Sequence, residues 1–372
     1  MNDEIDWASV RRDFPLLEGT AYLDSAAAGP VPRPVMEAGA GFYREMMLGA
    51  DALWEEWLHR REEVRRSIAS FINAEPEEIA LTTNTSSGMN LIVDALAGRG
   101  DVITSELEFP VSTITWLHRG VRVHFLISTG GEVRAGDVQR AMNEETGVIC
   151  LSHVQYSNGF RAELEELGQS KKGHALVVNA SQSAGAFELD VKRMGIDALC
   201  ATGHKWMLAG YGSGFVYLSR RLLEETRARA IGWLSVEEPY GMHNRDFRVR
   251  ADAARSELGC PHFAGIFALG AALDYLSRLG LRNIERRVLA LNRHLTERLL
   301  ARGWRVLSPL RDESMRSGET LVAVERPKRV VAHLAHSGVS VTEKPEGIRV
   351  ATHFFNNEDD IARLVDALED CK

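Results

Sequence analysis

Cysteine is scarce in this chain of 372 residues, and its four copies are scattered. They stand at Cys150, Cys200, Cys260 and Cys371, and no two of them have CxxC spacing. This distribution argues against a zinc site and against a disulfide framework, and it fits a reducing compartment. We therefore expect a cytoplasmic protein without a bound metal.

Long apolar runs are also absent. The chain has no stretch of about 18 apolar residues, which a transmembrane helix requires. The N-terminal residues 1–14 are charged and lack the apolar core of a signal peptide. Asp and Glu number 52 against 44 Lys and Arg, so the net charge is −8. We expect no membrane contact, and no nucleic-acid partner because such a partner requires a basic surface.

Short apolar runs alternate with helical patterns through the first 220 residues. The runs that look like buried strands are 79–82, 101–104, 121–126, 147–152, 175–178, 198–201 and 214–218. Helical patterns include 34–71 and 86–96. This alternation predicts an α/β fold with a mostly parallel sheet covered on both faces. From about residue 262 amphipathic helices and a few strand-like runs predict a smaller α+β domain.

The strongest chemical signal is Thr202-Gly203-His204-Lys205-Trp206, which follows one of these strands and precedes a glycine-rich loop. Ligands of open α/β sheets bind at the carboxyl ends of the strands. We therefore expect Lys205 at this edge of the sheet rather than on the general surface. A lysine held there can lose its proton and form a Schiff base with an aldehyde cofactor.

Two further polar motifs follow predicted strands. Asn179-Ala180-Ser181-Gln182 comes after the strand at 175–178, so its polar groups should face the same crevice. The segment from Thr82 to Gly88 ends another strand and begins an apolar helix. Backbone N–H groups and hydroxyls at a helix start suit a phosphate, although Asn and Ser are also ordinary N-caps.

Together these motifs resemble the class V aminotransferase family of fold-type I pyridoxal-phosphate enzymes, which includes cysteine desulfurases, kynureninases and isopenicillin N epimerase-like proteins. The resemblance runs from Tyr22-Leu23-Asp24 to the segment that begins at Arg349. It implies a large domain, residues 21–255, with a mostly parallel seven-stranded sheet. It also implies a small C-terminal α+β domain, residues 256–372, and an N-terminal segment, residues 1–20, that packs with it.

The resemblance implies pyridoxal 5'-phosphate as the cofactor and assigns residues to it. Lys205 would carry the Schiff base and shuttle protons at the substrate Cα. The phosphate would be held by residues near the helix start and the lysine: Thr85, Ser86, Ser87, Thr202 and His204. Phe109 would stack on the pyridine ring, unless it is an ordinary core residue, and Gln182 would bond the ring hydroxyl. Asn179 would stand beside the ring nitrogen.

The resemblance also assigns the substrate and partner contacts. Arg349 would bind the substrate carboxylate, because its planar fork matches a carboxylate; a surface ion pair is the alternative. Tyr156 would line the pocket, and His153 is either a pocket residue or a structural histidine. Relatives often carry Thr at Cys260, where it reaches the phosphate of the neighbouring subunit. A homodimer with shared active sites is therefore implied, and Cys260 departs from that pattern.

Two departures bear on the reaction. Most relatives have Asp at Asn179, and a neutral amide cannot keep the ring nitrogen protonated, so the electron sink is weaker. The alternatives are an engineered Asp→Asn change at this position and neutral drift in a damaged enzyme. Cysteine desulfurases carry a nucleophilic cysteine shortly before the arginine, whereas residues 336–348 contain none. We therefore do not expect a persulfide-forming cysteine desulfurase.

The favoured hypothesis is an enzyme that acts at Cα of an amino acid. A weak sink suits β-elimination of the C–S lyase type, or related decarboxylating chemistry, on a cysteine conjugate such as those of natural-product biosynthesis. An aminotransferase and an amino-acid epimerase are the alternatives. A non-catalytic protein that only binds the cofactor is a further alternative, against which the intact Lys205 argues.

Overall fold

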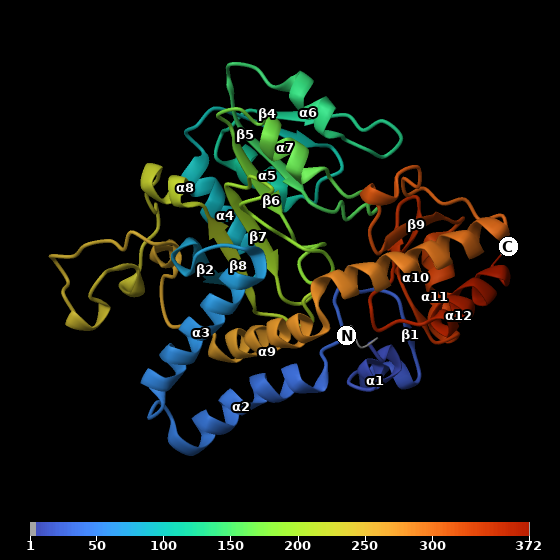
Figure 1. Ribbon diagram of the computed structural model, residues 1–372, viewed down its shortest axis with the longest axis horizontal. Coiled ribbons are helices and arrows are strands. Elements are labelled where there is room, and N and C mark those ends of the chain that lie inside the picture. Colours follow the sequence, from blue (N-terminus) through green and yellow to red (C-terminus); the bar gives the residue numbers. More distant parts are fainter. Residues whose placement is uncertain (1–4, 372) are drawn as a thin grey trace.

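The centre of the molecule is a seven-stranded sheet, seen in a computed structural model that describes residues 5–371 (Figure 1). Its strand order is β2-β8-β7-β6-β5-β3-β4. The strands are β2 (Ile79–Thr82), β3 (Asp101–Ser105), β4 (Val123–Leu126), β5 (Thr146–Ser152), β6 (Ala175–Asn179), β7 (Ala198–Thr202) and β8 (Gly214–Leu218). Only β8 runs against the others. The predicted α/β fold with a mostly parallel sheet is confirmed.

Both faces of the sheet are buried, because the strand side chains alternate between two cores. In β6, Leu176 and Val178 belong to one core, and Ala175 and Val177 to the other. The second core is closed by α4 (Thr85–Leu96), α5 (Val111–His118) and α8 (Arg220–Glu225). The first is closed by α6 (Ala135–Ala141), α7 (Leu164–Ser170) and α9 (Phe263–Leu279).

The single helix expected at 34–71 is wrong, because the structure has two helices there. They are α2 (Arg33–Gly49) and α3 (Trp54–Ile72), and α9 packs against both (Figure 1). Ala50 follows α2 with φ 49° and ψ −124°, a conformation that cannot continue a helix. Apolar periodicity persists on both sides of this turn, so the pattern alone did not reveal the break.

The C-terminal part forms a smaller α+β unit. A three-stranded antiparallel sheet contains β9 (Glu319–Ala323), β11 (Thr342–Lys344) and β12 (Gly347–Ala351). It packs with α10 (Leu281–Ala301), α11 (Pro327–His336) and α12 (Glu358–Glu369). Near the start of the chain, β1 (Ala21–Tyr22) pairs in parallel with β10 (Val339–Ser340). The two ends of the chain are therefore joined in one structural unit.

The N-terminal segment also contacts this unit. Arg11, in α1 (Trp7–Arg11), pairs with Asp360 of α12 at 2.7 Å. The ring of Phe14 lies 4.8 Å from that of Phe355. Residues 1–4 of the predicted segment 1–20 lie outside the described residues.

Helix α9 packs with the large domain rather than with the small one. Its side chains belong to the core of the large sheet, whereas Leu291 and Leu295 of α10 belong to the small-domain core. This packing differs from the predicted boundary at residue 255, and we propose that the small domain starts near Gly280 and includes β1. Within residues 5–371 no single helix is long and apolar enough to cross a membrane; α9 and α10 reach that length only together, across a 78° bend.

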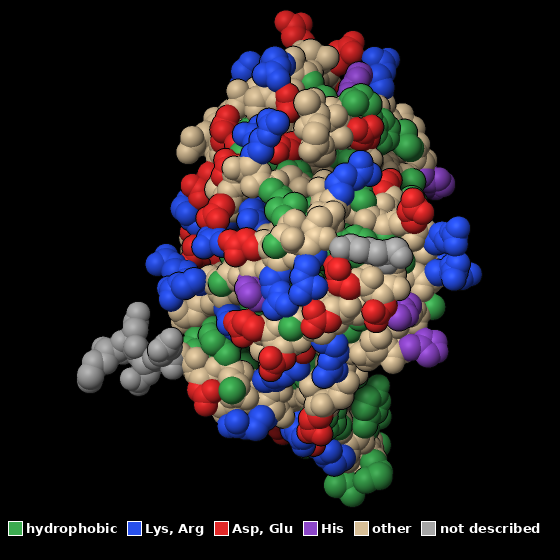
Figure 2. Space-filling model, turned by 90° about the vertical axis from the view of Figure 1, so that its right-hand side faces the viewer, with side chains coloured by type: hydrophobic (Ala, Val, Ile, Leu, Met, Phe, Trp, Pro, Cys, Tyr) green, Lys and Arg blue, Asp and Glu red, His purple; other side chains and the backbone are tan. Residues whose placement is uncertain are grey.

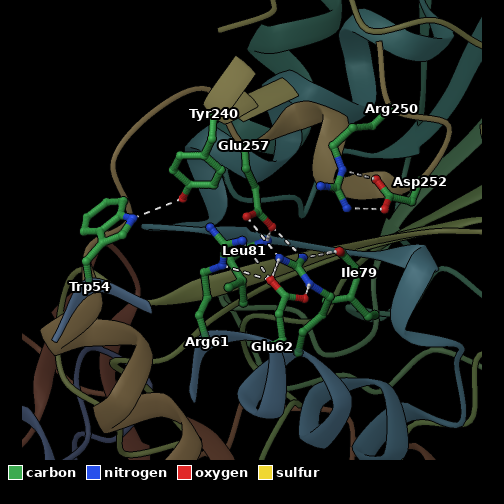
Figure 3. A network of polar contacts seen from close by, with 10 residues as sticks. Trp54, Arg61, Glu62, Ile79, Leu81, Tyr240, Arg250, Asp252 and Glu257 are labelled. Carbon is green, nitrogen blue, oxygen red and sulfur yellow. Dashed lines mark hydrogen bonds and ion pairs between the residues drawn. The ribbon is translucent and has the colours of Figure 1, made fainter. Parts of the chain in front are cut away.

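A buried ion-pair network anchors the edge strand β2 (Figure 3). Arg65 of α3 donates to the carbonyl oxygen of Ile79 at 2.7 Å and to Glu257 Oε1 at 2.5 Å. Trp54 Nε1 donates to the hydroxyl of Tyr240 at 3.1 Å. If Arg65 or Glu257 were removed, the other would remain as an uncompensated buried charge. This cost favours the arrangement in which the two are paired. The network therefore fixes the segment that leads into α9.

Candidate active site

The loop that carries Lys205 begins at the carboxyl end of β7 and is held from two sides. The N–H of Gly29 donates to the carbonyl oxygen of His204 at 2.8 Å. A Cβ atom on Gly29 would lie 2.3 Å from the carbonyl oxygen of Lys205, so only glycine fits this close approach. Behind the lysine, His353 Nε2 contacts the carbonyl oxygen of Trp206 at 3.1 Å. Segments near both ends of the chain thus position the lysine.

The amine of Lys205 is poised to react. Burial lowers the pKa of Lys205 to about 8; Glu319 opposes this shift, and the cations Arg349 and Lys344 add to it. Nζ lies 5.8 Å from the ring centre of Phe109. Among residues 5–371 it makes no hydrogen bond or ion pair. A neutral, unpaired amine is the form that attacks an aldehyde.

Phe109 lies over the same edge of the sheet and is not a core residue, since it is 44% exposed. Its ring meets that of Tyr156 edge to face at 5.2 Å. The preceding Glu108 is buried and accepts hydrogen bonds from Ser152 N at 2.7 Å and Gln155 Nε2 at 2.6 Å. These bonds fix the turn that presents Phe109. Sequence reasoning missed Glu108, because a lone acidic residue gives no sign of burial.

Asn179 ends β6 with its amide in one defined orientation. The backbone N–H of Ser181 can only donate, so the atom that faces it at 3.0 Å is the amide oxygen. The amide nitrogen therefore faces Ser112 and donates to its Oγ at 3.1 Å. One N–H of the amide remains available at this edge of the sheet.

Gln182 lies one turn further along the same loop, and it is buried. Its Nε2 donates to the carbonyl oxygen of Ala26 at 3.0 Å, and its Oε1 accepts from Trp206 Nε1 at 2.8 Å. Because a primary amide has two N–H groups, one donor remains for a ligand. Gln182 thus links the N-terminal segment to the lysine loop.

The start of α4 offers donors to an anion. Asn84 caps this helix by accepting from Ser87 N at 2.9 Å, and the N–H groups of Thr85 and Ser86 have no acceptor within the helix. Thr85 Oγ1 lies 2.6 Å from Ser181 Oγ, so the start of α4 and the loop after β6 bring their hydroxyls together. The side chains of Ser86 and Ser87 are exposed.

Thr202 Oγ1 and His204 Nδ1 form a hydrogen bond of 2.7 Å. The His204 ring stacks on Tyr211 with the ring centres 4.4 Å apart. Burial and the neighbouring Lys205 lower the pKa of His204 to about 4. His204 is therefore neutral at physiological pH and can offer a hydrogen bond, not a charge, to an anion.

Arg349 lies in β12 and is only 4% exposed, so it is not a surface ion pair. Its Nη1 donates to the carbonyl oxygen of Tyr156 at 3.1 Å, which brings the two predicted substrate residues together. Lys344 Nζ lies 4.3 Å from the ring centre of Tyr156. Asp24 and Glu319 each lie 3.7 Å from the guanidinium. Sequence reasoning missed Lys344 and Glu319, because they reach the site only through the packing of the small domain.

Two predicted residues do not join this cluster. Cys260 is exposed in the loop before α9, and its expected contact with a neighbouring subunit stays a prediction. His153 is buried against Phe187, and burial together with Arg161 lowers the pKa of His153 to about 3. Its position favours a structural histidine. Within residues 5–371 no group of His, Cys, Asp and Glu side chains is arranged to hold a metal ion.

The residues fit pyridoxal 5'-phosphate. An unpaired amine faces an exposed aromatic ring, and the start of α4 supplies N–H groups and hydroxyls for a phosphate. Beside this start, Thr82 Oγ1 is buried without a hydrogen-bond partner among the described residues. A buried hydroxyl left unpaired indicates a missing ligand or water. The cofactor would be held at its aldehyde by Lys205 and at its ring face by Phe109. Its ring nitrogen would face Asn179, and its ring hydroxyl would face Gln182.

Known proteins are similar to this chain over most of its length. The Aminotransferase class-V model matches residues 21–364. A probable cysteine desulfurase of Methanothermobacter thermautotrophicus is 34% identical over 292 residues, 74% of this chain and 72% of that protein. Isopenicillin N epimerase of Amycolatopsis lactamdurans is 28% identical over 98% of each chain. An apo cysteine desulfurase structure from Thermococcus onnurineus has a TM-score of 0.91 and 26% identity, over 100% of this chain and 99% of that one.

Proposed function

Because the chain belongs to the class-V aminotransferase family and uses the pyridoxal 5'-phosphate of that family, we propose that it catalyses β-elimination from a cysteine conjugate. The C–S bond breaks and the Cα proton leaves, one water molecule hydrolyses the unsaturated amine that remains, and the products are a thiol, pyruvate and ammonia. A related decarboxylating reaction on the same substrate class belongs to this proposal. The amino-acid substrate would be held by its carboxylate at Arg349, beside Tyr156.

The orientation of Asn179 carries the choice of reaction. Its oxygen accepts from the N–H of Ser181 and its nitrogen donates to Ser112, so the amide keeps one N–H that we assign to the ring nitrogen. A donor favours the unprotonated ring nitrogen, whereas a carboxylate would favour the protonated one. Negative charge at Cα is then less stabilised, which favours a reaction in which a leaving group departs promptly.

The residues of the chain divide the remaining work. When bound, the cofactor supplies the electron-withdrawing group that makes the Cα proton acidic. Lys205 takes that proton, since its amine has a pKa of about 8 and lies near the ring of Phe109. The rings of Phe109 and Tyr156 meet edge to face beside the site. Arg349 would orient the substrate by its carboxylate, which fixes the position of Cα in the site.

The segment before Arg349 supports a free thiol as the product. Residues 336–348 form the end of α11, β10, β11 and the turn into β12, and they contain no cysteine. Cys150 and Cys200 are buried in the sheet, and Cys260 and Cys371 lie elsewhere. We therefore propose that no persulfide forms on this chain, although several relatives are named cysteine desulfurases.

Epimerisation is the second candidate. The similarity to an isopenicillin N epimerase covers 98% of both chains. A weak electron sink is compatible with it, because the proton simply returns to Cα from the other face. Transamination is a third candidate, and it moves the proton to the cofactor, which the donor at Asn179 disfavours.

We also propose a homodimer in the cytoplasm. Figure 2 shows hydrophobic side chains on the projection at the bottom of the molecule, at the level of the α2–α3 turn. In this region Tyr43, Met46, Met47 and Leu48 are 40–83% exposed. Apolar side chains gathered on a protruding turn are typical of a protein interface. The four cysteines are unpaired, which supports a reducing compartment.

Product analysis of the holoenzyme tests the reaction. With S-alkyl cysteines we expect pyruvate, ammonia and the thiol to accumulate, while the visible absorption of the cofactor is restored after each turnover. A cofactor left as pyridoxamine phosphate would identify an aminotransferase. Inverted Cα stereochemistry without other products would identify an epimerase.

Asn179→Asp tests the inference drawn from the orientation of the Asn179 amide. The carboxylate would favour a protonated ring nitrogen, so the share of turnovers that end in pyridoxamine phosphate should rise about tenfold or more. Asn143→Asp is the control, because that exposed Asn acts through its oxygen, which Asp retains. An unchanged product ratio in Asn179→Asp would contradict the argument from the ring nitrogen.

A further inference from the structure

Glu319 is a buried carboxylate with no hydrogen-bond partner. It begins β9, its side chain has no exposed surface, and neither of its oxygens is bonded among residues 5–371. A buried polar group without a partner costs free energy, and most such groups in proteins are bonded. The presence of an unbonded Glu319 beside Lys205 and Arg349 therefore suggests a function for this carboxylate.

Charged groups face Glu319 from four elements. Arg349 of β12 is the nearest, with Nη1 3.7 Å from Oε2. Lys205 of the loop after β7, Lys344 of β11 and Asp24, which follows β1, complete the set. The 3.7 Å separation is too long for a hydrogen bond, so Glu319 faces the guanidinium without being fastened to it.

Arg349 consequently lies between two carboxylates. Its Nη2 is 3.7 Å from Asp24 Oδ1, on the other side from Glu319. The two differ in their support: Asp24 accepts from Thr342 Oγ1 at 2.7 Å, whereas Glu319 accepts from no donor. Burial raises the pKa of both groups, and the bond from Thr342 counteracts this only at Asp24.

A substrate carboxylate on Arg349 would be the third around one guanidinium. Like charges at this separation disfavour ionisation of the least supported member. The bond from Thr342 stabilises the charge of Asp24, and the fork of Arg349 would stabilise that of the substrate. Glu319 is the group left to take a proton.

We propose that binding of a substrate carboxylate at Arg349 is coupled to the uptake of one proton by Glu319, which makes Glu319 a specificity-determining residue of the site. The proton comes from solvent, and no covalent bond changes. The inference rests on the proposed function only in placing the substrate carboxylate at Arg349. It implies that the site accepts a carboxylate together with a proton, so the affinity for carboxylates falls as the pH rises.

Calorimetry on the holoenzyme measures this coupling directly. The probe is 3-(methylthio)propionate, which has the carboxylate and thioether of S-methylcysteine but no amino group that could titrate or react with the cofactor. Titrations at pH 8 in two buffers with different ionisation enthalpies give the number of protons bound per ligand. We expect about one proton. Across pH 6–9 the Kd should rise, with a slope that approaches tenfold per pH unit.

Glu319→Gln is the test variant, and Glu343→Gln is its matched control. Glu343 lies in β11 and is exposed, so its loss should leave the proton uptake unchanged. Glu319→Gln should take up no proton, bind the probe at least about tenfold more tightly at pH 8, and lose the pH dependence.

Three results would overturn the proposal: no proton uptake by the wild-type protein, uptake that persists in Glu319→Gln, or no probe bound by either. If Glu319→Gln does not fold, the two-buffer measurement on the wild-type protein decides alone. The proposed function can be rejected independently of the proton coupling. Turnover to another product with proton uptake intact would reject only the function, and β-elimination without proton uptake would reject only the coupling.

Discussion

At the scale of single residues, the site depends on groups whose usual charge is changed by burial. Lys205 and His204 are adjacent in the chain, and burial lowers the pKa of both, to about 8 and about 4. The result is a nucleophilic amine next to a neutral imidazole. Glu319 belongs to the same pattern, since burial raises its pKa. Each shift has the sign that desolvation gives to its charge type.

The pH dependence of cofactor uptake tests Lys205. A lysine with a pKa of about 8 is protonated below pH 8, and only the neutral amine attacks an aldehyde. The rate at which the apoprotein takes up pyridoxal 5'-phosphate should therefore rise with pH and level off above about pH 8. At pH 7 the rate should be roughly a tenth of the plateau. Stopped-flow absorbance measures it.

Lys205→Ala is the companion variant. It should lose the visible absorption of lysine-bound cofactor and slow proton removal from Cα by about 10²- to 10⁴-fold. Lys192→Ala, an exposed lysine paired with Glu75, is the control and should behave as the wild-type protein does. A visible band that survives in Lys205→Ala, or a rate of uptake that is flat from pH 7 to 9, would reject the assignment.

At the scale of elements, α4 has a structural cap and the proposed phosphate-binding end in the same turn. Asn84 satisfies the N–H of Ser87 and leaves the N–H groups of Thr85 and Ser86 free. A neutral cap is significant here, because Asp would cap the helix equally well but would repel a phosphate. Gly88 lets the helix approach the sheet, since a Cβ atom there would lie 2.8 Å from Val216.

Two substitutions at Asn84 separate these roles. Asn84→Ala should lower the free energy of unfolding of the apoprotein by about 1 kcal/mol, because the cap is lost. Asn84→Asp should keep that stability and weaken the binding of pyridoxal 5'-phosphate about three- to tenfold by charge repulsion. Urea unfolding and cofactor titration provide the two measurements. Equal cofactor affinity in Asn84→Asp and the wild-type protein would place the phosphate elsewhere.

At the scale of the whole molecule, the site lies where two domains meet. The large domain contributes Lys205, Phe109 and Asn179, and the small domain contributes Arg349 and Glu319. A change in the relative position of the domains would therefore move the carboxylate site against the lysine. The exposed α2–α3 turn lies on the large domain, away from the small one (Figure 1).

The homodimer is tested at this turn. Met47 and Leu48 are 76% and 83% exposed, and the double variant Met47→Lys, Leu48→Lys places two charges on the proposed interface. We expect light scattering to report a dimer for the wild-type protein and a monomer for the variant. The control is Ile127→Lys, which changes a side chain that is 74% exposed just after β4, at the far end of the sheet. A monomeric wild-type protein, or a variant that stays dimeric, would contradict the proposed interface.

The sequence by itself determined the strands of the large sheet and the loops at their carboxyl ends. Apolar runs and the polar residues that follow them are local features, and parallel strands bring their carboxyl ends to one edge whatever the loops do. Lys205, Asn179, Gln182 and Thr85 were therefore predictable. The resemblance to a family added the expected roles of Phe109 and Arg349, which local pattern does not supply.

Only the tertiary structure decided which charges surround Arg349. Asp24, Glu319 and Lys344 come from three separate segments, and they meet because β9, β11 and β12 pair in one small sheet while β1 joins its neighbour β10. A single acidic residue in a sequence does not reveal whether it will be exposed or buried. Its burial, and with it the charge it carries, depends on long-range packing that no local pattern encodes.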